Sequence, residues 1–216
     1  MPAIRQSAEE AVRLVRSGSI VMVGGFGLSG VPLRLIDALE RTEVRDLTVI
    51  SNNIGSPGKG LGKLLNSGRI KKAIGTYFTT NPDVGEAYHA GKIEVELIPQ
   101  GTFCEAIRAG GSGIPAFYTP TAAGTDLAKG KEIRYFDGRP YVLERALRGD
   151  VSLIRAHKAD ELGNLVYYKT ARNFNPLMAM ASDCVIVEVD EIVPAGSLDP
   201  EAIVTPHVFV DILVTE

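Results

Sequence analysis

The glycine-rich stretch VMVGGFGLSGVP, residues 21–32, is the part of this sequence best suited to bind an anion or a reacting carbonyl group. Residues 25–30 within it match the pattern G-x-G-x-x-G. The backbone N–H groups of such a loop, together with the N-terminus of a following helix, can hold a phosphate or a developing oxyanion. A tight turn between a strand and a helix, without any ligand, would use the same glycines. The stretch alone therefore leaves both interpretations open.

Two nucleotide-binding patterns make demands that the sequence does not meet. A dinucleotide site needs an acidic residue about 20 residues further on, at the end of the second strand. Residues 48–53 read TVISNN there and contain neither Asp nor Glu. The P-loop pattern G-x-x-x-x-G-K-[ST] occurs neither in the first glycine stretch nor in residues 55–60, GSPGKG. We therefore expect neither a nicotinamide site nor a P-loop.

Three neutral amides, Asn52, Asn53 and Gln100, form a second candidate site. The two asparagines follow the apolar run 47–50, and Gln100 follows the strand-like run 93–98. Open α/β sheets bind ligands at the carboxyl ends of parallel strands, so we expect these side chains to face one pocket. Amide donors stabilise an oxyanion without pairing with an anionic nucleophile, as a lysine or arginine would. The alternative is an Asx turn for the asparagines and an ordinary loop position for the glutamine.

Other polar residues have a structural explanation beside a chemical one. A nucleophilic Cys–His pair is conceivable for Cys104, but the three histidines are scattered and form no motif, which favours a small buried residue. Glu105 is expected to favour the N-terminus of a helix electrostatically. Residues 172–175, RNFN, fit either a cap of the following helix or an anion site. No cysteine spacing indicates a metal site, and we expect none.

The elements that must position these residues alternate between strands and helices in the first half of the chain. Ser7 and Glu10 form a possible capping box that opens a helix over residues 8–18, and Pro32 suits the first position of another helix. Strand-like runs at 19–23, 47–50, 70–78 and 93–98 alternate with helix-like segments at 33–41, 61–68 and 84–90. This order is typical of βαβ units and predicts an α/β fold with an open, mostly parallel sheet flanked by helices.

After about residue 111 the pattern changes to hairpins. Residues 133–143, IRYFDGRPYVL, have Asp137-Gly138 as a turn, and residues 151–169 form a second hairpin with a longer loop. We therefore expect an antiparallel hairpin part in the C-terminal half. No repeat or linker divides the chain, so residues 1–216 are expected to form a single domain.

Composition excludes several classes of function. The 216 residues carry a net charge of −3 and the pI is near 5.7, so no basic excess exists to neutralise nucleic acid. No apolar run approaches the roughly 18 residues of a membrane span, and the N-terminal residues lack a signal pattern. Two cysteines outside any C-x-x-C pair make a reducing cytoplasm the expected location.

Taken together, these motifs resemble the A (alpha) subunit of family I CoA-transferases, the 3-oxoacid, acetate and succinyl-CoA:3-ketoacid type. Residues 24–32 fit the family signature G-G-F-x(3)-G-x-P, although Ser17-Gly18 departs slightly from the residues preferred before it. Further matching stretches cover nearly the whole chain: SNN (51–53), VELIPQGT (95–102), RAGGSGIPAFYTPTAAGT (108–125), KAD…GNLVYYKTARNF (158–174) and EIVPAGSLDPEAIVTP (191–206). The resemblance implies the CoA-transferase/NagB-RpiA-like fold.

The resemblance also implies roles for the candidate residues. Asn52, Asn53 and Gln100 would line the pocket around the reacting carbonyl. Coenzyme A would enter only as part of the substrate, with no cofactor bound permanently. The residues implied to bind the coenzyme A moiety are Gly24, Gly25, Phe26, Gly27, Leu28, Ser29 and Gly30.

A partner chain follows from the family's mechanism. Its nucleophile is a glutamate in a Glu-Asn-Gly motif of the B half, and this chain contains no Glu-Asn dipeptide. The resemblance therefore implies activity only with a B subunit, in a complex of two A and two B subunits. CoA would move from succinyl-CoA or acetyl-CoA to a 3-oxoacid or short carboxylic acid through a glutamyl-CoA intermediate. Sugar-phosphate isomerases and ligand-binding regulatory domains of the same fold are the alternative functions.

Overall fold

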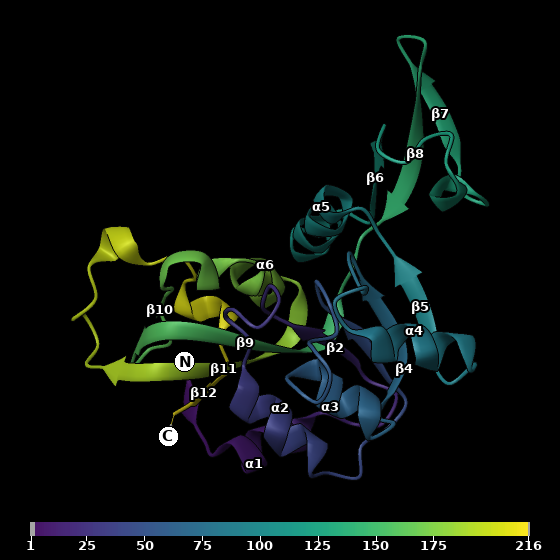
Figure 1. Cartoon of the computed structure of the whole chain (residues 1–216). Helices are drawn as coiled ribbons and strands as arrows, with labels where there is room; N and C mark the ends of the chain where they lie inside the picture. The colour runs from purple at the N-terminus through teal and green to yellow at the C-terminus, as the bar shows by residue number, and fades with distance from the viewer. Residues whose placement is uncertain (1–2, 216) are drawn as a thin grey trace.

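A large, mostly parallel sheet forms the centre of the computed structural model, which describes residues 3–215 (Figure 1). Its strands follow the order β1-β12-β11-β9-β2-β3-β4-β5, and β10 pairs with β9 in the antiparallel sense. Their bounds are β1 Ile4–Arg5, β2 Ile20–Val23, β3 Leu47–Ile50, β4 Ile70–Gly75, β5 Glu94–Leu97, β9 Gly149–Asp160, β10 Leu165–Val166, β11 Ser182–Val193 and β12 Ile212–Val214. The predicted α/β fold is confirmed.

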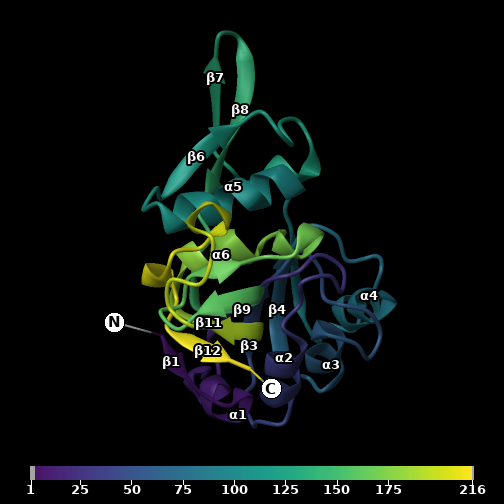
Figure 2. The same ribbon diagram turned by 90° about the vertical axis from the view of Figure 1, so that its left-hand side faces the viewer.

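Helices cover both faces of this sheet, as Figure 2 shows. Strand residues alternate between the two faces, so Val21 and Val23 of β2 lie in one core cluster and Met22 lies in the other. On the first face lie α1 Ala8–Ala11, α2 Leu33–Glu40, α3 Leu61–Asn66 and α4 Pro82–His89, and on the second lie α5 Gln100–Gly111 and α6 Asn175–Met180. The short 3-10 helices are η1 Val12–Leu14, η2 Asp126–Ala128, η3 Lys169–Arg172, η4 Pro200–Ala202 and η5 His207–Phe209.

The observed ends of the helices agree with the predicted ends only in part. The predicted capping box is confirmed, because Ser7 Oγ accepts from Glu10 N at 3.2 Å and the Glu10 carboxylate accepts from Ser7 N at 3.0 Å. The α-helix ends at Ala11, however, and continues only as a 3-10 turn to Leu14. Pro32 lies one position earlier than predicted, at the N-cap of α2.

The expectation for Glu105 was wrong. Because α5 already begins at Gln100, Glu105 lies in the second turn of the helix rather than at its N-terminus. There its carboxylate pairs with the Arg108 guanidinium at 2.7 Å, three residues further along.

Residues 116–145 form a second sheet that stands away from the body and is here called the arm (Figures 1 and 2). Its strands are β6 Ala116–Thr119, β7 Ile133–Phe136 and β8 Arg139–Arg145, in the antiparallel order β6-β8-β7. Asp137 and Gly138 form the predicted turn, with φ of 49° and 75°. Both predicted hairpins are therefore confirmed, since β9 and β10 form the other.

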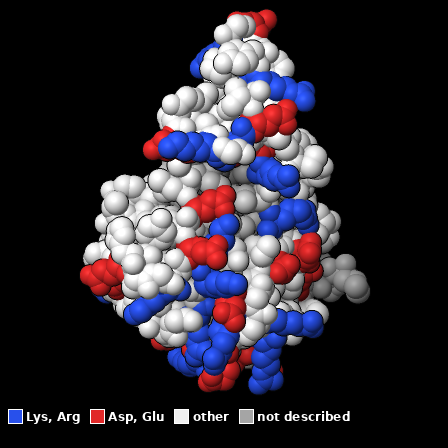
Figure 3. Space-filling model, turned by 90° about the vertical axis from the view of Figure 1, so that its right-hand side faces the viewer, with Lys and Arg blue, Asp and Glu red and all other residues white. Residues whose placement is uncertain are grey.

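No helix within residues 3–215 is long and apolar enough to cross a membrane. On the face of the molecule in Figure 3, basic and acidic side chains are interspersed over the body, without a region of a single sign.

Candidate active site

Four neighbouring parallel strands end at the candidate site. β2 leads into residues 24–30, here called the first glycine loop, and β3 leads into residues 51–53. Thr76 follows β4, and Gln100 comes shortly after β5. Ser51 Oγ donates to the backbone carbonyl of Val23 at 2.8 Å, which ties the end of β3 to the end of β2. The strand order therefore collects segments from the first hundred residues at one edge of the sheet.

The Asn52 side chain is the centre of an amide network. Its Nδ2 donates to Thr76 Oγ1 at 2.7 Å and to Gln100 Oε1 at 3.3 Å. Asn53 Nδ2 donates to Asn52 Oδ1 at 3.5 Å. The structure thus brings together all three amides that the sequence singled out.

The three amides differ in what they can still donate. Asn52 is buried and gives both hydrogens of Nδ2 to the network. Asn53 is also buried, and its Oδ1 accepts from Gly55 N at 3.0 Å, which is the Asx turn considered from the sequence. Gln100 is exposed and receives the Asn52 bond at Oε1, so its Nε2 donors lie on the other side of the amide. Gln100 is the amide best placed to donate to a substrate carbonyl.

The first glycine loop is a narrow hairpin turn. Phe26 and Ser29 exchange two backbone hydrogen bonds of 3.0 Å, and Gly27 between them has φ of 60°, in the left-handed region that favours glycine. Phe26 and Leu28 are exposed at its tip. The loop therefore exposes apolar side chains as well as its backbone.

Two asparagines from the C-terminal half hold this loop, and Asn173 is the first. Its Oδ1 accepts from Gly25 N at 3.1 Å, and its Nδ2 donates to Ser29 O at 3.1 Å. Asn173 has φ of 22° and ψ of −119°, a backbone conformation rarely adopted by residues with a side chain. One side chain in a strained position thus clamps both ends of the hairpin turn.

Asn175, which is fully buried, is the second. Its Nδ2 donates to Gly30 O at 3.0 Å, and its Oδ1 accepts from Arg155 N at 3.0 Å. The N-cap of α6 is Phe174, and no side chain caps that helix. Of the two interpretations of RNFN, the helix cap is therefore wrong, because these amides hold the glycine loop instead, and the anion site stays a prediction.

The N-terminus of α2, directly after the loop, already carries an anion of the protein's own. Glu188 Oε2 accepts from Arg34 N at 2.8 Å and from Leu35 N at 3.3 Å. Burial raises the pKa of the Glu188 carboxyl, although these two bonds and the nearby Arg155 guanidinium act to lower it. The helix amides that would hold a phosphate are therefore occupied by a carboxylate.

The cysteines are poor candidates for nucleophiles. Burial raises the pKa of the Cys104 thiol, and the neighbouring Glu105 carboxylate raises it further. Burial also raises the pKa of Cys184, to about 11. A thiol with a raised pKa holds little thiolate at neutral pH. Within residues 3–215, no group of three or more His, Cys, Asp or Glu side chains could hold a metal ion.

A family profile described as coenzyme A transferase matches residues 5–216 of the chain. The chain belongs to the coenzyme A transferase family. The resemblance drawn from the glycine signature and the stretches that follow it is thereby confirmed.

Bacterial members of the family are similar over most of their length. The chain is 50% identical over 210 residues to the A subunit of a probable succinyl-CoA:3-ketoacid coenzyme A transferase of Bacillus subtilis (strain 168), covering 97% of this chain and 88% of that one. It is 47% identical over 203 residues to the alpha subunit of the acetate CoA-transferase of Escherichia coli (strain K12), covering 94% and 92%.

A solved CoA-transferase structure has the same fold. The acyl-CoA transferase YdiF from Escherichia coli O157:H7 superposes with a TM-score of 0.86 at 22% sequence identity, covering all of this chain and 47% of that one. The chain thus spans about half the length of this larger transferase.

Three features of the candidate site escaped the sequence interpretation. Thr76 follows β4 just as Asn52 follows β3, but the predicted strand-like run 70–78 extends past the observed end of β4 at Gly75, so the strand-end rule did not mark this residue. Glu188 is a lone acidic residue in the apolar run VIVEV, which is a recognisable signal of a buried partner. The contacts of Asn173 and Asn175 with the glycine loop span more than 140 positions, and nothing local indicates them.

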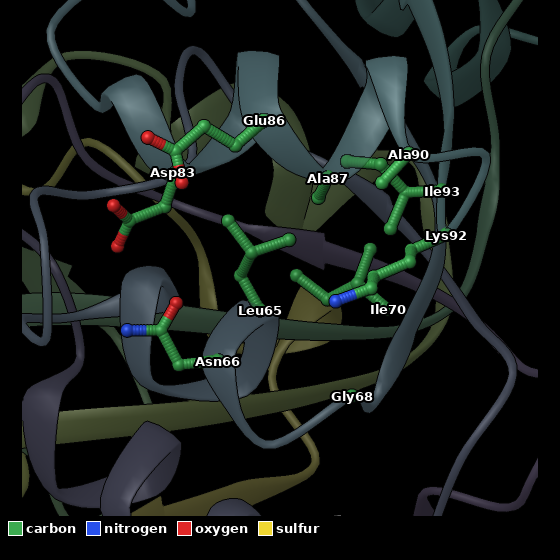
Figure 4. A pocket seen from close by; sticks show the side chains of 10 residues that line it. All are labelled: Leu65, Asn66, Gly68, Ile70, Asp83, Glu86, Ala87, Ala90, Lys92 and Ile93. Carbon is green, nitrogen blue, oxygen red and sulfur yellow. The ribbon is translucent and has the colours of Figure 1, made fainter.

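A cavity whose lining residues are drawn in Figure 4 lies away from the site. Its volume is about 630 Å³, and it lies between α3 and α4, at the amino ends of β4 and β5. Its lining includes Asn66, Asp83, Glu86 and Lys92 around an apolar floor. The amide network lies at the opposite, carboxyl ends of the strands, so this cavity is not part of it.

Proposed function

We propose that the chain is the A-type half of a CoA-transferase that moves CoA from succinyl-CoA or acetyl-CoA to a 3-oxoacid or a short carboxylic acid. The observation that carries this proposal is the neutral amide network around Asn52 and Gln100, which offers donors for an oxyanion but no nucleophile. The relatives are named as A and alpha subunits, which supports a second chain that supplies the nucleophile.

The proposed chemistry begins on the partner's glutamate. Its carboxylate oxygen attacks the thioester carbon, and the tetrahedral oxyanion collapses by breaking the C–S bond, which gives an acyl-glutamyl anhydride and CoA thiolate. The thiolate then attacks the glutamyl carbonyl and releases the acyl group as a carboxylate, leaving a glutamyl-CoA thioester. The second acid takes CoA by the reverse steps, so no external base or oxidant is required.

In this scheme Gln100 donates from Nε2 to the oxyanion, and Asn52 holds Gln100 in place. A neutral donor suits this position, because a cation here would pair with the glutamate and weaken it as a nucleophile. Asn53 acts one step further away, by orienting Asn52 and fixing the backbone after β3.

For residues Gly24 to Gly30 we propose contact with the thioester end of the coenzyme A moiety rather than with its phosphates. Two observations support this assignment. The exposed Phe26 and Leu28 side chains are apolar, and the N-terminus of α2 is occupied by Glu188. Coenzyme A is thus a substrate moiety here.

Alanine substitution of the amides tests the proposal in the reconstituted complex with a companion chain that carries a Glu-Asn-Gly motif. We expect Gln100→Ala to lower kcat by about 10-fold to 100-fold, somewhat less than the loss of a principal oxyanion donor, because the partner supplies donors too. Asn52→Ala should lower kcat by a smaller factor. A rise in KM for the acyl-CoA with unchanged kcat would assign Gln100 to substrate binding alone.

The lone chain is the control for the function itself. We expect no transfer from succinyl-CoA to acetoacetate, or from acetyl-CoA to short acids, until the companion is added. Robust transfer by this chain alone would refute the proposed division of labour. Analytical ultracentrifugation of the active complex would then test the proposed composition of two A and two B subunits.

A further inference from the structure

One face of the arm carries a row of aromatic side chains flanked by arginines. Residues directly opposite each other in antiparallel strands share a face, and the register pairs Tyr118 with Leu143, Arg134 with Tyr141, and Phe136 with Arg139. These six residues are here called the aromatic face of the arm: Tyr118, Arg134, Phe136, Arg139, Tyr141 and Leu143.

Ring contacts order this face. The Phe136 ring meets Tyr118 and Tyr141 edge-on, with centroids 5.6 Å and 5.2 Å apart. The guanidinium groups of Arg134 and Arg139 lie 5.3 Å and 6.0 Å from the centroids of Tyr118 and Tyr141. Phe136 nevertheless remains 45% exposed. Tyrosine and arginine are the residue types that most often dominate the binding energy of protein interfaces.

The opposite face of the arm is covered only near its base. Val142 is fully buried there, and the buried Glu144 carboxylate accepts from Lys131 Nζ at 2.7 Å, but Ile133 and Tyr135 on the same face are 39% and 71% exposed. Exposure therefore does not distinguish the two faces. The aromatic face differs from the other in its ordered row of rings and guanidinium groups, the composition of a surface that contacts another protein.

The base of the arm lies next to the segment that leads to Gln100. A hollow of about 370 Å³ there is lined by Leu143 of the aromatic face, by Lys131 and Glu144, and by Ile98, which lies two residues before Gln100. Figure 1 shows β5, the strand that leads to Gln100, pointing toward the base of the arm. A molecule that delivers a side chain to Gln100 would therefore lie along this hollow and against the arm.

We propose that the aromatic face is the docking surface for the partner B subunit. This inference rests on the proposed function, because it is the missing nucleophile that requires a second chain beside Gln100. A second copy of this chain lacks the Glu-Asn dipeptide and would leave the site without a nucleophile. The two arginines require a matching B surface that combines apolar groups with carboxylates.

Two matched pairs of variants test the docking surface. Phe136→Ala removes the centre of the aromatic face, whereas Tyr135→Ala removes a 71% exposed neighbour on the opposite face. Arg139→Glu reverses a charge on the aromatic face, whereas Lys129→Glu reverses an exposed charge outside the strands. The dissociation constant for the companion chain is measured by titration calorimetry, and the thermal midpoint of each lone chain reports its folding.

We expect Phe136→Ala and Arg139→Glu to raise the dissociation constant at least tenfold, with both controls within twofold of wild type. If Phe136→Ala lowers the thermal midpoint of the lone chain, its weaker binding could come from misfolding. The dissociation constant of Arg139→Glu then tests the docking surface. Equal binding by all four variants, in a wild-type pair that assembles and transfers CoA, overturns this inference and leaves the proposed function intact. A wild-type chain that neither binds the companion nor transfers CoA overturns both. Variants that change only self-association of the lone chain would assign the face to a second copy and refute the proposal.

Discussion

The chain contains two glycine loops that fold alike but are held in place differently. In the first, Phe26 and Ser29 exchange backbone hydrogen bonds. In residues 55–60, here called the second glycine loop, Ser56 and Lys59 exchange bonds of 3.2 Å and 2.9 Å in the same way. Each loop follows a parallel strand and precedes a helix, although only the first matches G-x-G-x-x-G. The hairpin turn, and not the letter pattern, is what the two loops share.

The residues that hold the two loops in place differ in how far along the sequence they lie from the loop. The second loop is fastened locally, since Asn53 Oδ1 accepts from Gly55 N at 3.0 Å. The first loop is fastened by Asn173 and Asn175, and the helix after it by Glu188. Its shape therefore depends on the whole sheet being assembled, because these supports come from β11, from the chain just before α6 and from the first residue of α6. Long-range support of this kind fits the proposed role of the loop, in which its tip contacts the substrate.

Alanine substitution of one glycine in each loop should give the largest difference in the free energy of unfolding. A Cβ at Gly30, where φ is 68°, would lie 2.4 Å from the carbonyl oxygen of Ala171. A Cβ at Gly58, where φ is 64°, would meet no heavy atom within 4 Å. We expect Gly30→Ala to lower the free energy of unfolding by about 3–5 kcal/mol, through left-handed strain and a backbone collision. Gly58→Ala should lower it by about 1–2 kcal/mol, through strain alone.

Urea denaturation of the two variants at one pH measures this difference. The common left-handed conformation makes each variant the control for the other, because only the collision distinguishes them. Similar losses for both would show that the contact with Ala171 relaxes easily and that the first loop is no more constrained than the second.

Removal of the asparagine supports should give the next largest effect. Asn175→Ala leaves the Gly30 and Ala171 carbonyls and the Arg155 N–H without their partner, in a fully buried position. We expect a loss of about 2–4 kcal/mol in the free energy of unfolding.

Asn53→Ala is the matched variant in the second loop. It removes one acceptor for a backbone N–H and should lower the free energy of unfolding by about 1 kcal/mol. Both variants are compared by their urea midpoints. An Asn53→Ala loss as large as that of Asn175→Ala would contradict the view that the second loop needs only local support.

The same comparison explains how much of this molecule could be predicted. The strands after which Asn52 and Gln100 come were evident from apolar runs and turn residues, and their parallel order followed from the helices between them. The rule that ligands bind at the carboxyl ends of such strands then brought both amides to one site. The sequence marks Asn173 and Asn175 only as polar residues before a helix, because their partners lie across the sheet. Because that pairing depends on β9 lying between β2 and β11, it could not be inferred from local sequence.

The Glu188 carboxylate at the N-terminus of α2 is a support that the second loop lacks. Its titration should have the smallest effect on the free energy of unfolding. Burial raises the folded-state pKa of Glu188 above its ordinary value of 4.5, so the folded protein binds this proton more tightly than the unfolded chain does. Below about pH 4.5 the carboxyl is protonated in both states and its titration contributes nothing. As the pH rises from 4.5 through the raised pKa, the wild type should lose stability relative to Glu188→Gln, which cannot ionise. Urea midpoints between pH 4.5 and 7 measure that relative loss, with Asn53→Ala as a control whose difference from wild type should stay constant. A wild type that gains stability over Glu188→Gln as the pH rises would show that the α2 amides and Arg155 outweigh burial, and that the helix terminus is a stronger anion site than this structure indicates.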